Sequence, residues 1–127
     1  MPFKMEKLIF FVDDDKMMLN LLEYTMKNRQ NYDIRTFNSG EDCLKNMELK
    51  PNLIVLDHIF NGTSKMSGIE VLKEIKKVNK LLPVVILSST EDQSIAKEFL
   101  MNGASRFILK NDYFIDTLME AIDHEIH

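Results

Sequence analysis

Three consecutive carboxylates, Asp13, Asp14 and Asp15, directly follow the apolar run LIFFV at residues 8–12. Adjacent acids repel one another, so a bound cation would stabilise this arrangement. Oxygen ligands without a cluster of His or Cys favour Mg²⁺ over zinc, and Mg²⁺ usually keeps several of its waters. The alternative interpretation is a solvated turn in which these acids simply face water.

Polar side chains also follow three other short apolar runs. Asp57 ends LIVLD, Ser88 follows VVIL, and Lys110 follows FIL. Each of them alone is a common residue at the end of a strand, but together they favour a shared site. A carboxylate can attack phosphorus and form an acyl phosphate. Phosphoryl transfer further requires positioning and charge neutralisation, which a divalent cation, an amine and a hydroxyl would supply.

The elements that must position these residues follow from the apolar pattern. Four runs are nearly continuous, which is typical of strands covered on both faces, whereas YDIRTF alternates, which is typical of a strand with one exposed side. The pattern predicts strands at residues 8–12, 32–37, 53–56, 84–87 and 107–109.

Segments with helical spacing of apolar residues separate and follow the strands. The clearest lie at residues 16–28, 69–78, 95–100 and 114–122, and a less regular one lies at 41–48. The side chains expected to face the core include Met18, Leu21, Leu22 and Met26, then Ile69, Leu72, Ile75 and Val78, and finally Phe114, Leu118 and Ile122. Capping boxes are expected for Ser39 with Asp42, Ser67 with Glu70, and Thr90 with Gln93.

Strand and helix thus alternate five times, which predicts an α/β fold with a doubly wound parallel sheet and helices on both faces. Ligands bind such sheets beyond the carboxyl ends of the strands, so the polar residues that follow the strands are expected to meet at one edge. The 127 residues suffice for one domain, 1–127, with a sizeable core.

Composition excludes several classes of protein. The net charge of −4 provides no basis for binding nucleic acid, and no apolar stretch has the length of a membrane span or signal peptide. We therefore expect a cytoplasmic protein without membrane insertion. The single cysteine, Cys43, excludes an internal disulfide and is expected to be a packing residue.

The segments FFVDDD, LIVLD, VILSST and GASRFILK occur in an order and at spacings similar to those of the receiver domains of two-component response regulators. The chain resembles this family over almost its whole length. The resemblance implies a flavodoxin-like fold with five helices and a five-stranded sheet in the order 2-1-3-4-5. It also implies a signalling switch rather than an enzyme, although one that catalyses its own phosphorylation and dephosphorylation.

The resemblance further assigns the acidic residues. Asp57 would be the phosphoacceptor, and Asp13 and Asp14 would organise Mg²⁺ beside it. The backbone carbonyl of Ile59 would be a further metal ligand. Asp15 falls outside the acidic pair and is expected at the N-terminus of a helix, where the dipole favours an acid.

The remaining roles concern the phosphoryl group and the response to it. Ser88 and Lys110 would contact the phosphoryl oxygens, and Ser88 with Phe107 would form the switch. Ile59 and Thr90 would flank the approach of water to the acyl phosphate. Ile59 cannot orient a water molecule and Thr90 carries no carboxylate, so we expect slow self-dephosphorylation.

Two stretches depart from the family. The segment 58–67 is longer than usual by roughly three residues and has no proline, which indicates either a mobile loop or a partner-specific one. Asn111 stands where the family has a proline, usually after a cis bond. A cis bond would cost about 3–4 kcal/mol without proline, so Lys110 is expected to be placed either by a trans bond with a shifted loop or under strain.

We expect Asp57 to accept a phosphoryl group from a sensor histidine kinase or a phosphotransfer protein. The surface of the fourth helix, fifth strand and fifth helix would then change its affinity for a downstream target or output domain. No output domain follows residue 127, so the chain either acts by docking or is part of a longer protein. One alternative is a non-phosphorylated protein-binding module on the same scaffold. Another is a small phosphohydrolase, but no second acid closely follows Asp57 to activate water.

Overall fold

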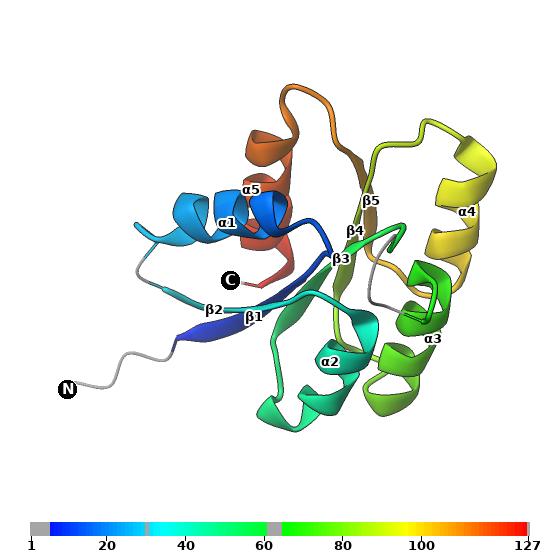
Figure 1. Cartoon of the computed structure of the whole chain (residues 1–127), viewed down its shortest axis with the longest axis horizontal. Coiled ribbons are helices and arrows are strands. Elements are labelled where there is room, and N and C mark those ends of the chain that lie inside the picture. The colour runs from blue at the N-terminus through cyan, green and yellow to red at the C-terminus, as the bar shows by residue number, and fades with distance from the viewer. Residues whose placement is uncertain (1–5, 30, 61–64, 127) are drawn as a thin grey trace.

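The computed structural model describes residues 6–29, 31–60 and 65–126. Its strands form one parallel sheet in the order β2-β1-β3-β4-β5 (Figure 1), which confirms the order implied by the family resemblance. The strands are β1 (Lys7–Val12), β2 (Tyr32–Phe37), β3 (Leu53–Asp57), β4 (Val84–Ser88) and β5 (Arg106–Leu109).

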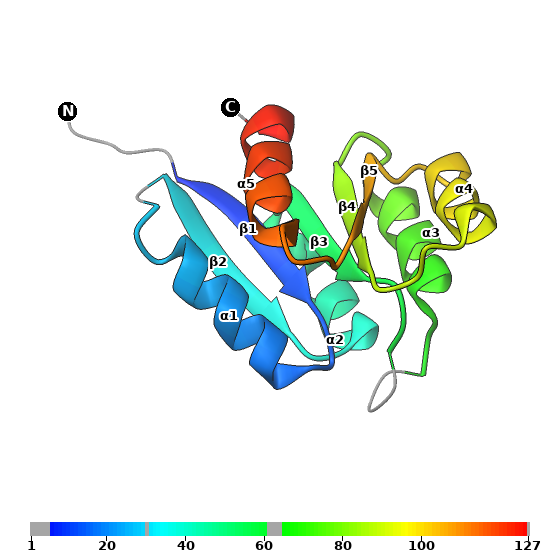
Figure 2. The same ribbon diagram turned by 90° about the horizontal axis from the view of Figure 1, so that it is seen from above.

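The helices cover both faces of the sheet. They are α1 (Lys16–Met26), α2 (Gly40–Lys45), α3 (Gly68–Val78), α4 (Gln93–Met101) and α5 (Phe114–Glu125). Helices α1 and α5 pack on one face, and α2, α3 and α4 pack on the other (Figure 2). The segment 41–48 was expected to be one helix. It is instead the short α2 followed by a 3₁₀ turn, Met47–Leu49.

Each strand supplies side chains to both cores because successive residues point to opposite faces. On β1, Ile9 and Phe11 join the cluster under α1 and α5, whereas Phe10 and Val12 join the cluster under the other three helices. Strands β3 and β4 are buried along their whole length. Three of the four nearly continuous apolar runs are therefore the central strands β1, β3 and β4, whereas the fourth, at 107–109, is the edge strand β5 and is only partly buried. Cys43 is fully buried in the core, as expected.

Two residues expected in the core lie outside it. The buried stripe of α1 contains Leu19, Leu22 and Met26, whereas Leu21 is 41% exposed. Leu19 and Leu22 lie three residues apart and share one helix face, from which Leu21 is turned away by about 100°. Val78 is the last residue of α3, and its side chain faces solvent.

Helix starts follow the predicted caps with one exception. Ser39 accepts a hydrogen bond from the backbone N–H of Asp42, and Ser67 and Glu70 form the reciprocal capping box. The expected Thr90–Gln93 box is wrong. Asp92 caps α4 by accepting from the backbone N–H of Ser94 at 2.9 Å, because it lies next to the first helical residue. Within the described part of the chain, no helix is long and apolar enough to cross a membrane.

Candidate functional site

The carboxyl ends of four strands bring the predicted polar residues to one edge of the sheet. Asp57 and Ser88 are the last residues of β3 and β4, while Asp13 and Lys110 directly follow β1 and β5. The Lys110 Nζ lies 2.9 Å from the Asp57 Oδ1 and 3.4 Å from the Asp13 Oδ2. Residues 97 positions apart in the chain thus form one ionic cluster.

Three carboxylates share this edge with a single ammonium group. Asp13, Asp14 and Asp57 each place one oxygen so that all three lie within 4.8 Å of one another. Asp13 and Asp57 are only 3% and 8% exposed. Lys110 pairs with both Asp57 and Asp13, so these two buried carboxylates share one ammonium charge in a poorly solvated place.

The acid pKa values reflect this imbalance. Burial raises the pKa of Asp13 to about 6, and the charge of Asp57 acts in the same direction. Burial also raises the pKa of Asp57, although the hydrogen bond and charge of Lys110 oppose the rise. Burial by itself would lower the pKa of Lys110, but the hydrogen bond and charge of Asp57 outweigh it and raise that pKa.

The donor set fits a small divalent cation. Carboxylate oxygens are hard ligands, and a 2+ charge would offset the repulsion between three carboxylates whose oxygens lie within 4.8 Å of one another. Asp13, Asp14 and Asp57 are the residues that would hold Mg²⁺. Asp15 is not part of the group, because its side chain accepts from the backbone N–H groups of Met17 and Met18 at the start of α1. This confirms its predicted place at a helix N-terminus.

Lys110 reaches the acids without a proline after it. No cis peptide bond occurs among the described residues, so the Lys110–Asn111 bond is trans. The backbone N–H of Lys110 donates to the Ser88 carbonyl at 2.7 Å, which ties the end of β5 to β4. The Asn111 side chain accepts from the N–H of Tyr113 and forms its own turn. The trans alternative therefore holds.

Ser88 is almost fully buried, and its Oγ accepts from the backbone N–H of Thr90 at 3.0 Å. The same Oγ lies 3.0 Å from the Nδ1 of His58. The His58 ring packs edge-on against Phe99 of α4, with centroids 5.4 Å apart, and lies 6.4 Å from Phe107. Burial and the charge of Lys110 lower the pKa of His58.

Sequence reasoning assigned His58 no role, since a lone histidine is a poor candidate for a metal ligand. The signal that could have drawn attention to it is its place directly after Asp57, at the end of a fully buried strand. The partner of its ring could not be read from the chain, because Ser88 lies 30 residues away.

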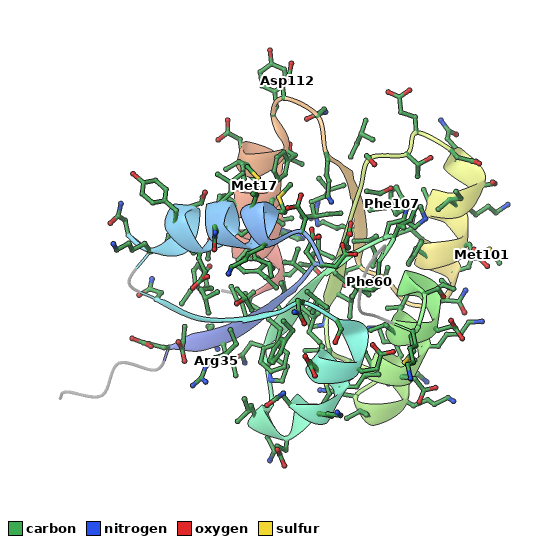
Figure 3. The ribbon with its side chains drawn as sticks, in the orientation of Figure 1. Met17, Arg35, Phe60, Met101, Phe107 and Asp112 are labelled. Atoms are coloured by element: carbon green, nitrogen blue, oxygen red, sulfur yellow. The ribbon has the colours of Figure 1, made fainter. Side chains whose placement is uncertain are left out.

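The remaining predicted residues are Ile59, Thr90 and Phe107, which follow or belong to the strands that carry the site. Ile59 follows His58 and is 49% exposed, and Thr90 is partly buried with its Oγ1 accepting from the N–H of Asp92. Phe107 lies between β5 and α4 (Figure 3), with its ring 5.8 Å from that of Phe99. No structural feature here tests the metal ligation by the Ile59 carbonyl or the roles of Ile59, Thr90 and Phe107, which stay predictions.

The segment 58–67 begins and ends at fixed points, and its residues 61–64 lie outside the described part. At its far end, the Glu41 Oε2 accepts from the backbone N–H groups of Lys65 and Met66 at 2.9 and 3.0 Å. Gly68 then lies against the carbonyl groups of Asp57 and His58, where a Cβ would collide. Helix α3 therefore begins in close contact with the end of β3.

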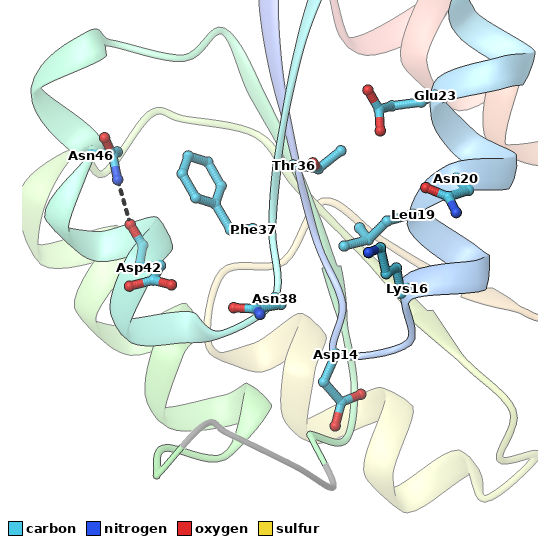
Figure 4. Close-up of a pocket in the computed structure, with 10 residues that line it drawn as sticks. All are labelled: Asp14, Lys16, Leu19, Asn20, Glu23, Thr36, Phe37, Asn38, Asp42 and Asn46. Carbon is cyan, nitrogen blue, oxygen red and sulfur yellow. Dashed lines mark hydrogen bonds between the residues drawn. The ribbon is translucent and has the colours of Figure 1, made fainter.

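An open groove of about 630 Å³ borders the cluster on the side of α1. Figure 4 shows Asp14 at one end of this groove, with Lys16 and Asn38 beside it. Asp13, Asp57 and Lys110 do not line it. Asp14 therefore connects the carboxylate group to the groove, while the ion pairs of Lys110 with Asp13 and Asp57 lie outside its lining.

Comparison with known proteins agrees with this geometry. Residues 9–123 match the family described as the response regulator receiver domain. The alkaline phosphatase synthesis transcriptional regulatory protein PhoP of Bacillus subtilis is 35% identical over 84% of this chain and 43% of its own length. The chemotaxis protein CheY of Thermotoga maritima is 29% identical over 84% of this chain and 87% of its own length.

The solved receiver domain of NtrX from Brucella abortus has a TM-score of 0.83 and 28% sequence identity, over 93% of this chain and 97% of that domain. The chain spans less than half the length of PhoP. The sheet order, the acids at the strand ends and the family match over 9–123 agree, and the chain therefore belongs to the response regulator receiver domain family.

Proposed function

We propose that this receiver domain is a phosphorylation-dependent switch whose acceptor is Asp57. The observation that carries the proposal is the ion pair between Asp57 and Lys110 at 2.9 Å, with the carboxylates of Asp13 and Asp14 beside it. Receiver domains are signalling switches rather than enzymes with an external substrate. The donor would be a phosphohistidine on a sensor histidine kinase or a phosphotransfer protein in the cytoplasm.

The transfer forms one bond and breaks one. A carboxylate oxygen of Asp57 attacks phosphorus, and the P–N bond of the donor breaks with its electron pair going to the imidazole. The hydrogen bonds to the Asp57 side chain from Lys110 and from the N–H of His58 both go to Oδ1. This supports Oδ2 as the attacking oxygen. The product is an acyl phosphate whose oxygens lie beside Lys110 and Ser88.

Bound Mg²⁺ would neutralise charge on the transferring group, held by Asp13, Asp14, Asp57 and the backbone carbonyl of Ile59. The side chains of this chain do the rest. Lys110 already lies against Asp57 and would move its hydrogen bond to a phosphoryl oxygen. Ser88 would donate its hydroxyl proton to another oxygen. Each of these contacts stabilises negative charge that is present only after transfer.

The response would pass from Ser88 to the surface of α4, β5 and α5. Phe107 on β5 packs against Phe99 of α4. A change at Ser88 that alters this packing would therefore affect both β5 and α4. We propose that phosphorylation shifts a population between two packings of Phe107, and that a downstream target or output domain binds one of them.

The test is labelling with radioactive phosphoramidate in Mg²⁺, which requires no partner protein. Wild-type protein should accumulate a hydroxylamine-labile phosphate, and Asp57→Asn should accumulate none because its amide cannot form an acyl phosphate. Asp15→Asn is the matched control: Asp15 is a neighbouring acid that caps α1, and its Asn variant should be labelled like wild type. Chelation of Mg²⁺ should suppress the labelling of wild type and of Asp15→Asn alike.

The outcome separates the three functions considered. Label on Asp57→Asn would place the acceptor elsewhere and refute the proposal. A non-phosphorylated binding module would take up no label at all. A phosphohydrolase would consume phosphoramidate rapidly without accumulating phosphoprotein.

A further inference from the structure

The hydroxyl group of Ser88 makes a buried contact that the proposed function does not use. Ser88 is 1% exposed, and its Oγ accepts a hydrogen bond from the N–H of Thr90. A buried hydroxyl also carries one proton, which needs an acceptor. Among the described residues, only the Nδ1 of His58, at 3.0 Å, is placed to accept it.

This role belongs to the neutral form of the His58 ring, which burial and the charge of Lys110 favour by lowering its pKa. A neutral imidazole has one protonated and one unprotonated nitrogen. With Nδ1 accepting from Ser88, the proton of His58 resides on Nε2.

The backbone of His58 is held while its ring has room. Its N–H donates to the Leu87 carbonyl at 2.9 Å and to the Asp57 Oδ1 at 3.0 Å, and Gly68 lies against its carbonyl. The ring borders a cavity of about 310 Å³ between the end of β3 and α4, lined also by Phe60, Ile95 and Phe99. The ring can therefore turn without moving the strand.

We propose that His58 is a positioning residue that holds the hydroxyl proton of Ser88 in the resting protein, so that the phosphoryl group on Asp57 must compete with His58 for it. The proposal rests on the proposed function. Ser88 has one proton, and it cannot be donated to Nδ1 and to a phosphoryl oxygen at once. His58 therefore favours the resting form.

The same contact connects the site to the aromatic cluster. The His58 ring touches Phe99 on α4 and lies near Phe107 on β5. When Ser88 turns to the phosphoryl group, the ring of His58 loses its polar partner and becomes free to repack against these two residues. His58 is thus a direct link between the hydroxyl and the elements expected to respond.

The experiment measures the affinity of beryllofluoride, a phosphoryl mimic, for Asp57 in Mg²⁺ by fluorine NMR. His58→Phe keeps a ring but has no acceptor, so it leaves the resting hydroxyl unpaired. It should bind beryllofluoride about 3- to 10-fold more tightly, the range expected for one buried hydrogen bond. His58→Asn places an amide oxygen near the position of Nδ1 and should stay within about twofold of wild type.

A double-mutant cycle with Ser88→Ala separates the hydrogen bond from packing. Without the hydroxyl there is nothing to compete for, so His58→Phe should leave beryllofluoride affinity unchanged in the Ser88→Ala background. An equal gain in both backgrounds would show that the ring acts by packing alone and would overturn the proposal. So would a His58→Asn variant that behaves like His58→Phe.

Nitrogen NMR of the wild-type imidazole tests the bond without any phosphoryl mimic. We expect the proton on Nε2 and a hydrogen-bonded Nδ1 in the free protein, and loss of that bond on binding beryllofluoride. A proton on Nδ1 in the free protein would refute the proposal. Wild-type protein that binds no beryllofluoride but shows the expected tautomer would refute the competition and the proposed function, while confirming the resting bond.

Discussion

Lys110 touches two carboxylates but can neutralise only one, and this decides the electrostatics at the scale of single residues. Its Nζ lies 0.5 Å closer to Asp57 than to Asp13, at 2.9 against 3.4 Å. Asp13 is also the less exposed of the two acids. Burial therefore raises the pKa of Asp13 to about 6. The ionised carboxylates at this site lower the stability of the folded protein, and a bound cation would offset that loss.

Replacing Asp13 by Asn should stabilise the metal-free protein in a pH-dependent way. The pKa of Asp13 is about 6 in the folded protein and 3.8 in the unfolded chain, so the folded form binds the proton more tightly between these values. The free energy of unfolding of wild type therefore falls as pH rises through this window. Asp13→Asn should raise the free energy of unfolding by about 1–3 kcal/mol at pH 7 and change it little at pH 4.

Urea unfolding at pH 4 and pH 7 with a chelator present measures this effect. Asp15→Asn serves as the control, because the exposed Asp15 lies outside the ionic cluster. The difference in free energy of unfolding between this variant and wild type should be the same at pH 4 and pH 7. An Asp13→Asn protein no more stable than wild type at pH 7 would contradict the electrostatic account.

The lifetime of the phosphoryl group should depend on Ile59 and Thr90. Ile59 is exposed and apolar, while the Thr90 Oγ1 is occupied by the N–H of Asp92. Neither side chain can activate water. Changing both, Ile59→Asn with Thr90→Glu, should shorten the lifetime by roughly tenfold or more, since a carboxylate could then act as a general base.

Loss of radioactive label from purified phosphoprotein in Mg²⁺ follows this lifetime. Ile59→Val keeps an apolar β-branched side chain and should leave the lifetime unchanged. If the double variant keeps its label as long as wild type, control of water would belong to the loop 61–67 instead.

At the scale of elements, the junction of β3 and α3 supports the site. Gly68 opens α3, and a Cβ there would collide with the carbonyl of His58 and stand 3.0 Å from the carbonyl of Asp57. The Ser67–Glu70 capping box sets the direction of the helix immediately before this contact. Asp57 and the start of α3 are thus placed by one backbone contact.

Gly68→Ala should therefore damage both stability and phosphorylation. The collision is with backbone, which cannot turn aside, so we expect a loss of about 1–3 kcal/mol in the free energy of unfolding. Labelling by phosphoramidate should slow as Asp57 is displaced. Guanidinium unfolding and initial labelling rates measure the two effects.

Gly103→Ala is the matched control. Gly103 follows α4 with a φ of 104°, which an alanine adopts only with strain, but it lies away from the acids. The Gly103→Ala protein should be less stable than wild type, but its folded molecules should be labelled at the wild-type rate. Equal labelling by folded Gly68→Ala would show that the junction does not position Asp57.

At the scale of the whole molecule, two cores on opposite faces of the sheet are joined through the strands. The core under α2, α3 and α4 includes Phe99 and contacts Phe107, so the proposed response to phosphorylation would reach this core first. The core under α1 and α5 packs on the other face. A change at the end of β4 is therefore expected to spread along α4 and β5 first.

Phe107→Ala should separate phosphorylation from the response. Phe107 lies outside the ionic cluster, so the rate of labelling by phosphoramidate should stay within about twofold of wild type. Hydrogen exchange in α4 and β5 should change on phosphorylation in wild type and lose most of that change in the variant. Phe37→Ala, which removes another half-buried ring that packs on Phe10, should keep the exchange response.

Phe37→Ala is therefore the control for a general loosening of the core caused by removing a half-buried ring. A Phe107→Ala protein with the full exchange response would assign Phe107 to packing alone. The signal would then have to reach α4 by another route, for which the His58 contact with Phe99 is the candidate.

The local pattern of the chain determined the elements and the edge on which the site lies. The runs LIVL and VVIL are apolar at every position, and such runs are stable only as central strands. Because all five strands are parallel, residues that directly follow them meet at one edge, which explains why Asp13, Asp57 and Lys110 could be placed together in advance. Ser67 and Glu70 are close in sequence, so their capping box was also predictable.

Only the tertiary structure decided which side chains touch across the sheet edge. The His58–Ser88 contact joins the ends of two strands, and it depends on how Phe99 of α4 packs against the His58 ring and how Gly68 packs against the His58 backbone. Likewise, Asp92 rather than Thr90 caps α4 because the path of the loop after β4 decides where the helix starts. Such contacts are governed by packing between distant segments, whereas hydrophobic period and turn chemistry describe only neighbours along the chain.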